Sequence, residues 1–159
     1  VFKTPADNRT DYIKRLIGMP GDELQFVNGE ILINNKKIKR EKVDKIKEVT
    51  CGANTLDVVT HRETLPNGIN YFASYNKYGT LLNSPKYKVP KDHFFLLGDN
   101  RDCSKDSRYL GSVGYVKSLN LVGKAQIIFF SNDTLKGSLL KIWNLHNSFR
   151  FNRLFKKIK

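Results

Sequence analysis

Apolar and polar residues alternate along much of the chain with the two-residue period of β-strands. Around Asn28-Gly29 the apolar positions of this pattern are Leu24, Phe26, Ile31 and Ile33. Asn-Gly supplies the positive φ angles that a two-residue type I′ turn requires. The stretch "LQFVNGEILI" therefore predicts a β-hairpin.

Three further stretches predict strands of the same core. "DYIKRLIGMPGD" alternates through Tyr12, Lys14 and Leu16 and stops at Gly18, so it indicates a strand that ends in a turn. "HFFLLG" and "LVGKAQIIFF" are short apolar runs, which are typical of buried strands.

The composition between these runs changes to Lys, Asn, Thr and Tyr, with strand-like pieces such as "INYFASY". We expect a mainly β fold: an antiparallel core of residues 1–34 and 89–131, with a smaller β-rich subdomain inserted at 35–88. A tail of residues 132–159 follows. In the tail, helical spacing of Leu139, Ile142 and Trp143 behind a possible Ser138 cap predicts a short helix.

The chain is strongly basic, with 28 Lys and Arg against 15 acids and a net charge of +13 in 159 residues. Such a charge favours phosphate-bearing partners. The basic residues are spread over 36–47, 86–91 and the C-terminus instead of forming one stripe, so we expect no specific nucleic-acid binding. "FRFNRLFKKIK" interleaves basic and apolar side chains, which fits an anionic membrane surface. The same sequence is also compatible with a tail whose aromatic residues close the core while its basic residues stay solvated.

The two cysteines, Cys51 and Cys103, form no CxxC pair and no zinc-type spacing, so no metal is expected. A disulfide and two free thiols are both open. No apolar run approaches the roughly 18 residues that cross a bilayer, and the chain as given opens with no signal peptide.

Lys14 is the first candidate for chemistry, because its strand places it between the apolar Tyr12 and Leu16. Neutralising an ordinary lysine at pH 7 costs roughly 4 to 5 kcal/mol, and burial reduces that cost, which would make the amine a general base. A solvated strand edge explains the same Lys-Arg pair.

The second candidate is the charged segment "GDNRDCSKDSRYLG" at residues 98–111, directly after an apolar run. Its charged residues nearly balance, so they can neutralise one another in ion pairs that hold a loop against the core. An ordinary solvated loop is the alternative.

Together, "DYIKRLIGMPGD" and "GDNRDCSKDSR" closely resemble two signature blocks of the bacterial type I signal peptidases, membrane-anchored proteases that remove signal peptides from exported proteins. "VFKTP" and "LVGKAQIIFFS" extend the resemblance over most of the chain. It implies a signal-peptidase fold and a Ser-Lys dyad in place of Ser-His-Asp.

The resemblance also implies roles for individual residues. Lys14 matches the general base, and Ser104 matches the serine that orients its amine. Asp106 and Arg108 match a supporting ion pair, and Asp99 and Arg101 match structural members of the block. Substrate pockets for small side chains, typically Ala-x-Ala before the cut, lie near the positions matched by Tyr12 and Ile13.

The sequence departs from the family pattern in two places. Cys103 stands where the family most often has Asn, a change that we expect to leave the chemistry alone. The nucleophile block, Ser-Met-x-Pro after a membrane anchor, would precede "VFKTP", and the first serine of this chain is Ser74. Neither Ser104 nor Ser107 has an identifiable oxyanion hole. We expect the nucleophile in a separate segment and the 159 residues alone to be inactive.

The resemblance thus predicts a serine endopeptidase that removes signal peptides after small residues and needs no cofactor. Its partners would be signal-peptide-bearing preproteins and an anionic membrane surface, with the catalytic region on the outer, periplasmic face of the bacterial inner membrane. The alternatives are an inactive fragment or half of a split enzyme that still holds signal-peptide ends, and a basic module for membranes or nucleic acid.

Overall fold

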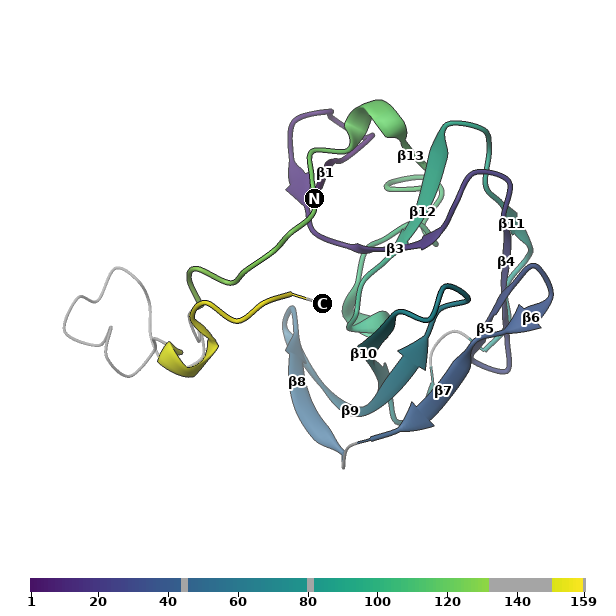
Figure 1. The fold of residues 1–159 in the computed structure, drawn as a ribbon. Coiled ribbons are helices and arrows are strands. Elements are labelled where there is room, and N and C mark those ends of the chain that lie inside the picture. The colour runs from purple at the N-terminus through teal and green to yellow at the C-terminus, as the bar shows by residue number, and fades with distance from the viewer. Residues whose placement is uncertain (44–45, 80–81, 132–149, 159) are drawn as a thin grey trace. The chain divides into compact units, whose positions relative to one another are not determined.

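The computed structural model describes four stretches of the 159-residue chain, 1–43, 46–79, 82–131 and 150–158. The chain divides into two compact units, Val1–Gly123 and Lys124–Lys159. All of the candidate site residues lie in the first unit, which is shown with its strands in Figure 1.

Antiparallel strands make up the first unit, so the mainly β prediction is confirmed. The strands are β1 (Phe2–Lys3), β2 (Asp11–Tyr12), β3 (Arg15–Gly18), β4 (Glu23–Val27), β5 (Glu30–Ile33), β6 (Lys36–Lys37), β7 (Lys39–Lys42), β8 (Lys47–Cys51), β9 (Asn54–Thr64), β10 (Asn70–Asn76), β11 (Tyr87–Lys88), β12 (His93–Leu97) and β13 (Val116–Lys117). Short 3-10 turns are η1 (Arg101–Cys103), η2 (Ser118–Asn120) and, in the second unit, η4 (Phe151–Arg153).

The strands form four small sheets. Their orders are β1-β2, β11-β4-β5-β6, β13-β12-β3, and β10-β9-β7 with β8 also paired to β9. The predicted hairpin is β4–β5, whose turn residues Asn28 and Gly29 have φ angles of 49° and 75°, both positive as the I′ turn requires. The predicted strands at 93–97 and 70–76 are present as β12 and β10.

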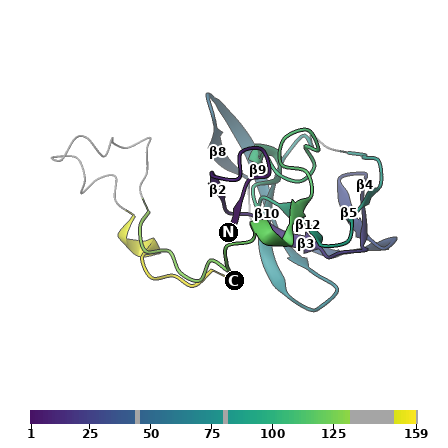
Figure 2. The ribbon, with the colours of Figure 1, turned by 90° about the horizontal axis from the view of Figure 1, so that it is seen from above.

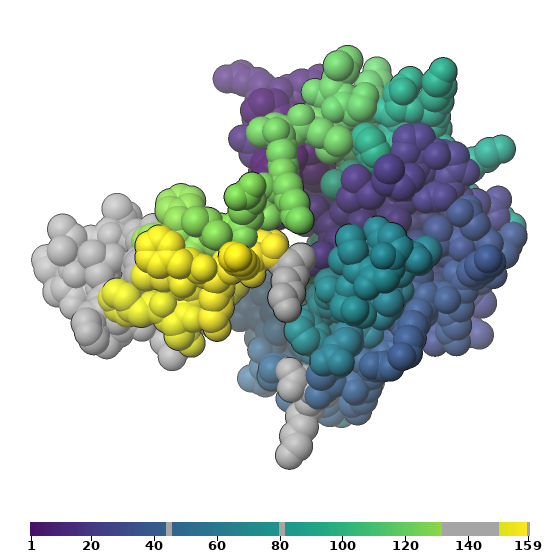
Figure 3. Space-filling model, viewed as in Figure 1, coloured from purple at the N-terminus to yellow at the C-terminus, as the bar shows by residue number. Residues whose placement is uncertain are grey.

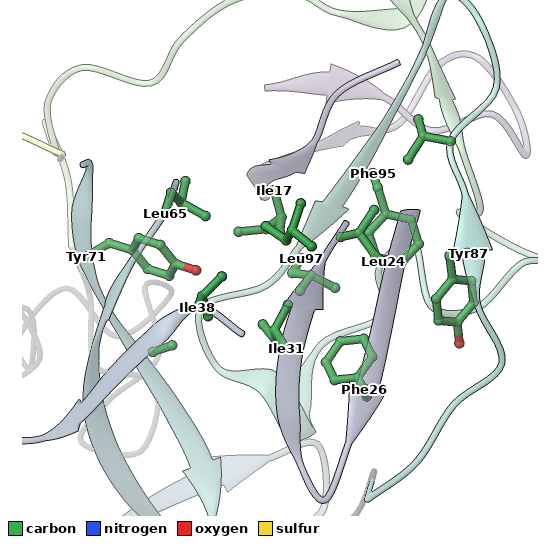
Figure 4. Close-up of a cluster of buried hydrophobic side chains, with 13 residues drawn as sticks. Ile17, Leu24, Phe26, Ile31, Ile38, Leu65, Tyr71, Tyr87, Phe95 and Leu97 are labelled. Atoms are coloured by element: carbon green, nitrogen blue, oxygen red, sulfur yellow. The ribbon is translucent and has the colours of Figure 1, made fainter. Parts of the chain in front are cut away.

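One hydrophobic cluster joins three of these sheets. Ile17 of β3, Leu24 of β4 and Leu97 of β12 meet Tyr71 of β10 and Leu65, which follows β9, and Figure 4 shows these side chains pointing into one interior. In the view from above, β3 and β12 lie between the β4–β5 hairpin and the β9–β10 ribbon (Figure 2). The strands of 54–76 therefore share a core with β3 and β12, while the predicted limits of an inserted subdomain stay a prediction.

The predicted continuous strand through Lys14 is wrong. The chain forms β2, leaves strand geometry at Ile13 and Lys14, and resumes as β3. The break arises because β2 pairs with β1 whereas β3 pairs with β12, so the segment changes partner at Lys14.

The prediction that "LVGKAQIIFF" is a buried core strand is also wrong. Leu121 makes a bridge to Phe2, but residues 124–130 belong to the second unit, and several of their apolar side chains are exposed. There the Ile128 N–H donates to the Lys156 carbonyl at 3.0 Å, and the Phe155 N–H donates to the Ile128 carbonyl at 2.7 Å. The segment pairs with the chain's own tail. The helix predicted near 138–143 lies outside the described residues.

Candidate active site

Lys14 lies at the break between β2 and β3, and its side chain is half-buried. Its Nζ is 5.6 Å from the centre of the Tyr12 ring. Burial lowers the pKa of Lys14 below the ordinary value of 10.5, because a charged amine loses hydration there. The negative charges of Asp106 and Asp99 raise the pKa of Lys14, and the positive charge of Arg108 lowers it further. The net direction is towards a neutral amine, the form that can accept a proton.

Ser104 lies beside Gly98, close to the same amine. A Cβ on Gly98 would collide with the Ser104 side chain and would lie 3.5 Å from Lys14 Nζ, so the hydroxyl and the amine flank one point. Ser104 is buried, and its Oγ has no hydrogen-bond partner among the described residues. A buried hydroxyl without a partner is rare in folded proteins, and Lys14 Nζ lies beside the same glycine.

Gly98 makes this approach possible, and sequence reasoning did not single it out. It follows β12 directly, at the point where the buried strand turns into the charged segment. Its lack of a side chain leaves the space that Ser104 fills. A glycine immediately after a buried strand was the available signal.

Asp106 and Arg108 form an ion pair beneath this loop. Arg108 Nε and Nη2 donate to the two Asp106 carboxylate oxygens at 2.8 Å each, and the Gly98 N–H donates to Oδ2 at 2.9 Å. Asp106 is fully buried and Arg108 is nearly so. Arg108 also donates to the Arg101 carbonyl oxygen. The pair therefore fixes both ends of the loop that carries Ser104.

Arg101 is fully buried and connects the loop to the β9–β10 sheet. Its Nη2 lies 2.7 Å from a carboxylate oxygen of Glu63, which is also fully buried, and its guanidinium donates to the hydroxyls of Tyr71 and Tyr75 at 3.1 and 2.8 Å. Both tyrosines also donate to Glu63. Burial raises the pKa of Tyr71 and of Tyr75, although the Arg101 charge acts in the opposite direction, so both stay neutral donors. Sequence reasoning placed Arg101 but missed its three partners.

Asp99 pairs with the residue next to Lys14. Arg15 donates to the two carboxylate oxygens of Asp99 at 2.7 and 2.8 Å. The Arg15 guanidinium also lies 4.2 Å from the centre of the Tyr71 ring. The Asp99 carbonyl accepts from the Ser74 N–H of β10 at 2.7 Å. In the space-filling view, the purple N-terminal surface adjoins the teal surface of the β10 region (Figure 3). The Arg15–Asp99 ion pair and the Ser74–Asp99 hydrogen bond thus join the lysine segment, the charged loop and β10.

The remaining predicted positions differ in exposure. Ile13 is 65% exposed, whereas Tyr12 is half-buried and packs edge to face on Phe2 at 6.0 Å. Their role in substrate binding stays a prediction. Ser107 is fully buried and its Oγ accepts from the Leu96 N–H at 2.9 Å, so this hydroxyl supports β12.

The two cysteines form a disulfide, which decides the alternative that the sequence left open. The bond joins the end of β8 to the end of η1. Across the described stretches, no group of three or more His, Cys, Asp or Glu side chains is arranged to hold a metal. In the same stretches, no helix has the length and apolar character needed to cross a bilayer.

Fold and site together define a mainly antiparallel β protein whose candidate active site places a half-buried lysine amine beside a buried serine hydroxyl. The family model described as "Signal peptidase, peptidase S26" matches residues 1–130. Signal peptidase I of Rickettsia typhi is 38% identical over 176 aligned residues, with 99% of this chain and 63% of the relative covered. That of Rickettsia bellii is 36% identical, with 99% and 58% covered.

A solved signal peptidase I from Enterococcus faecalis is 23% identical over 77% of this chain and 89% of that one, with a TM-score of 0.39. The chain belongs to the signal peptidase family, peptidase S26, which is a family of serine proteases. It spans less than two thirds of the length of the curated relatives it matches.

Proposed function

We propose that this chain is the lysine-bearing part of the catalytic region of a signal peptidase I. The whole enzyme, with its nucleophile, hydrolyses the peptide bond after a small residue at the end of a signal peptide. The observation that carries the proposal is the Lys14 amine, whose pKa is lowered by burial and which shares the space beside Gly98 with the unpartnered Ser104 hydroxyl. A lysine held in this way serves as a general base at a lower pH than an exposed one.

In the proposed reaction, neutral Lys14 takes the proton of a serine hydroxyl as the serine oxygen attacks the scissile carbonyl carbon. The lysine then gives the proton to the departing amine, and water hydrolyses the acyl-enzyme by the same base. The Ser104 hydroxyl, which has no partner among the described residues, forms a hydrogen bond at Nζ in the proposed reaction and so orients the amine. No metal or cofactor enters these steps.

The nucleophile in this proposal comes from a segment outside the 159 residues. Ser104 is buried against Gly98, and the Ser107 hydroxyl is already bonded to the Leu96 N–H, so neither presents an oxygen to a peptide carbonyl. The isolated chain is accordingly expected to bind signal-peptide ends without cutting them.

The proposed partners are preproteins and an anionic membrane surface, at the outer face of the bacterial inner membrane. A disulfide is typical of that oxidising side. Within the described part of the second unit, Phe129 and Phe155 are 79% and 73% exposed, near Arg153, Lys156 and Lys157. Exposed aromatics among basic residues suit an anionic lipid interface. Flotation with phosphatidylglycerol vesicles, but not with phosphatidylcholine vesicles, is the expected result.

The test of the catalytic proposal uses the full-length parent protein and a peptide substrate with Ala-x-Ala before the cut. Lys14→Met should lower kcat by about a hundredfold to ten-thousandfold, the range of a lost general base. Lys91→Met, which removes an exposed lysine of the same unit, is the matched control and should leave turnover unchanged. In the wild type, kcat/KM should rise with pH through the lowered pKa of Lys14. Retained turnover in Lys14→Met contradicts the assignment, and a wild-type protein that binds the peptide without cutting it would indicate a binding module.

A further inference from the structure

The Cys51–Cys103 disulfide covalently joins two parts of the first unit that are 52 residues apart in sequence. Cys103 is the last residue of η1, and Ser104 follows it directly. Cys51 is the last residue of β8, at the turn into β9. These are the only two cysteines in the chain. The bond thus ends one residue away from Ser104, whose hydroxyl lies beside Gly98 as the Lys14 amine does.

The β8–β9 hairpin has little else to hold its end in place. Among the described strands, β8 pairs with β9 alone (Figure 1), and none of its five residues is buried. Residues 54–57 of β9 pair with β8 alone and none of them is buried, so this end of the hairpin is two-stranded, and such a ribbon is at best marginally stable by itself. The disulfide therefore fixes the hairpin end and η1 to each other.

Ser104 depends on its neighbours for its position, because its own Oγ has no hydrogen-bond partner among the described residues. On the C-terminal side the chain is held at Asp106 by Arg108 and by the Gly98 N–H. On the N-terminal side the adjoining residue is Cys103, whose side chain is the covalent link. The backbone of Ser104 is thus held between the Asp106–Arg108 ion pair and η1, where the disulfide at Cys103 adds to the contacts of Arg101 and Asp102.

We propose that the Cys51–Cys103 disulfide positions Ser104 beside the Lys14 amine, so that reduction by a dithiol slows peptide-bond cleavage while the chain stays folded. The inference rests on the proposed function. In the reduction, one thiolate of the dithiol attacks one cysteine sulfur and forms a mixed disulfide, which releases the other cysteine as a thiolate. The second thiol of the dithiol then attacks the mixed disulfide and releases the first cysteine. Two cysteine thiols form, and the dithiol leaves as its cyclic disulfide after giving up two electrons.

The other groups around Lys14 do not change in this reaction. They are Asp106, Arg108 and Asp99, which act on its charge, and the Tyr12 ring. A change in the titration of Lys14 in the double variant Cys51→Ala/Cys103→Ala, which adds no titratable thiol, would therefore report on the position of Ser104.

The first experiment compares the oxidised full-length protein with the dithiol-treated protein and with the double variant Cys51→Ala/Cys103→Ala. Reduction and the double variant should each lower kcat about tenfold and leave KM nearly unchanged. Both should move the acidic limb of the pH–rate profile to higher pH. Dithiol should have no effect on the double variant. Ile31→Val, a core substitution on β5, controls for a general loss of stability and should leave the pH profile in place. Unchanged kcat in the double variant, with a lower unfolding temperature only, overturns the inference.

The second experiment needs no turnover. NMR of ¹³C-labelled lysine, with the Lys14 signal assigned by Lys14→Arg, measures its pKa in the oxidised chain and in the double variant. We expect the pKa of Lys14 to rise in the double variant, because a displaced Ser104 leaves the amine less buried. A lowered pKa that is identical in both proteins rejects the positioning role and leaves the proposed base intact. A lysine that titrates at its ordinary value in both proteins rejects the proposed base itself, so the two failures are distinguishable.

Discussion

Ser104 fills the space that a side chain on Gly98 would occupy, and Lys14 Nζ lies 3.5 Å from the position of that absent Cβ. The glycine at the end of β12 is thus as necessary to the site's geometry as the two side chains that meet beside it. Because the fit of Ser104 depends on this absent carbon, adding a methyl group at Gly98 tests the site directly.

Gly98→Ala should displace Ser104 from the amine and destabilise the loop. Overpacking of this kind costs about 1 to 3 kcal/mol, and activity should fall further than stability because the hydroxyl is pushed away from Lys14. Urea unfolding and peptide cleavage measure the two effects. Gly111→Ala is the matched control, since a Cβ there would meet nothing within 4 Å, and it should change neither quantity. A fully active Gly98→Ala would contradict the packing described.

Ser104→Ala and Ser107→Ala form a matched pair with opposite expected outcomes. Ser104→Ala removes a buried hydroxyl without a partner, so stability should hold or rise while kcat falls more than KM changes. Ser107→Ala removes the acceptor of the Leu96 N–H, so stability should fall by about 1 to 3 kcal/mol. Thermal unfolding and steady-state kinetics of both variants decide the point. An unchanged kcat in Ser104→Ala removes the orienting role from this residue.

Asp106→Asn should destabilise the first unit by about 3 to 5 kcal/mol, because it leaves the nearly buried Arg108 charge without its partner. Activity should fall as well, since the Gly98 N–H donates to the same carboxylate. Asp11→Asn breaks an exposed pair with Lys3 and should cost at most about 1 kcal/mol. Denaturant unfolding compares the two. Equal, small losses would mean that the Asp106 pair contributes no more than a surface pair.

The lowered pKa of Lys14 also predicts a pH dependence of stability. Between the folded pKa and the ordinary value of 10.5, the unfolded chain binds more protons at this residue than the folded one does, so Lys14 makes stability rise with pH in that window. Below the folded pKa the cost of burying the charge is fully present. Lys14→Met should therefore be more stable than the wild type at neutral pH, and the difference should shrink as pH approaches 10.5. Urea unfolding at several pH values tests this. Lys88→Met, at an exposed lysine of β11, is the control and should show no such trend. A stability difference between Lys14→Met and wild type that stays constant with pH would contradict the burial of Lys14.

Local sequence signals predicted those parts of the fold that local geometry determines. Asn28-Gly29 indicated the β4–β5 hairpin because its turn needs positive φ at both residues. The apolar run "HFFLLG" located β12, and the strand-like piece "INYFASY" located β10. The break at Lys14 was missed because alternation continues through it, while the change of partner from β1 to β12 is a tertiary event. "LVGKAQIIFF" misled because its apolar residues pair with the tail.

The candidate site was predictable only in part for the same reason. The resemblance to a family pointed to Lys14 and Ser104, and the structure brings them to one point beside Gly98. Nothing in the residues near Arg101 indicated Glu63, because the two are 38 positions apart and meet only when β9 packs on η1. The Cys51–Cys103 pairing spans a similar distance and needed the fold to decide it.

The buried contact between Glu63 and Arg101 has a consequence for the biosynthesis of the molecule. Until β9 and β10 have docked on the charged loop, Arg101 has no buried carboxylate, and the loop that carries Ser104 lacks this anchor. In the proposed function, a partly folded chain would therefore lack a fully held site.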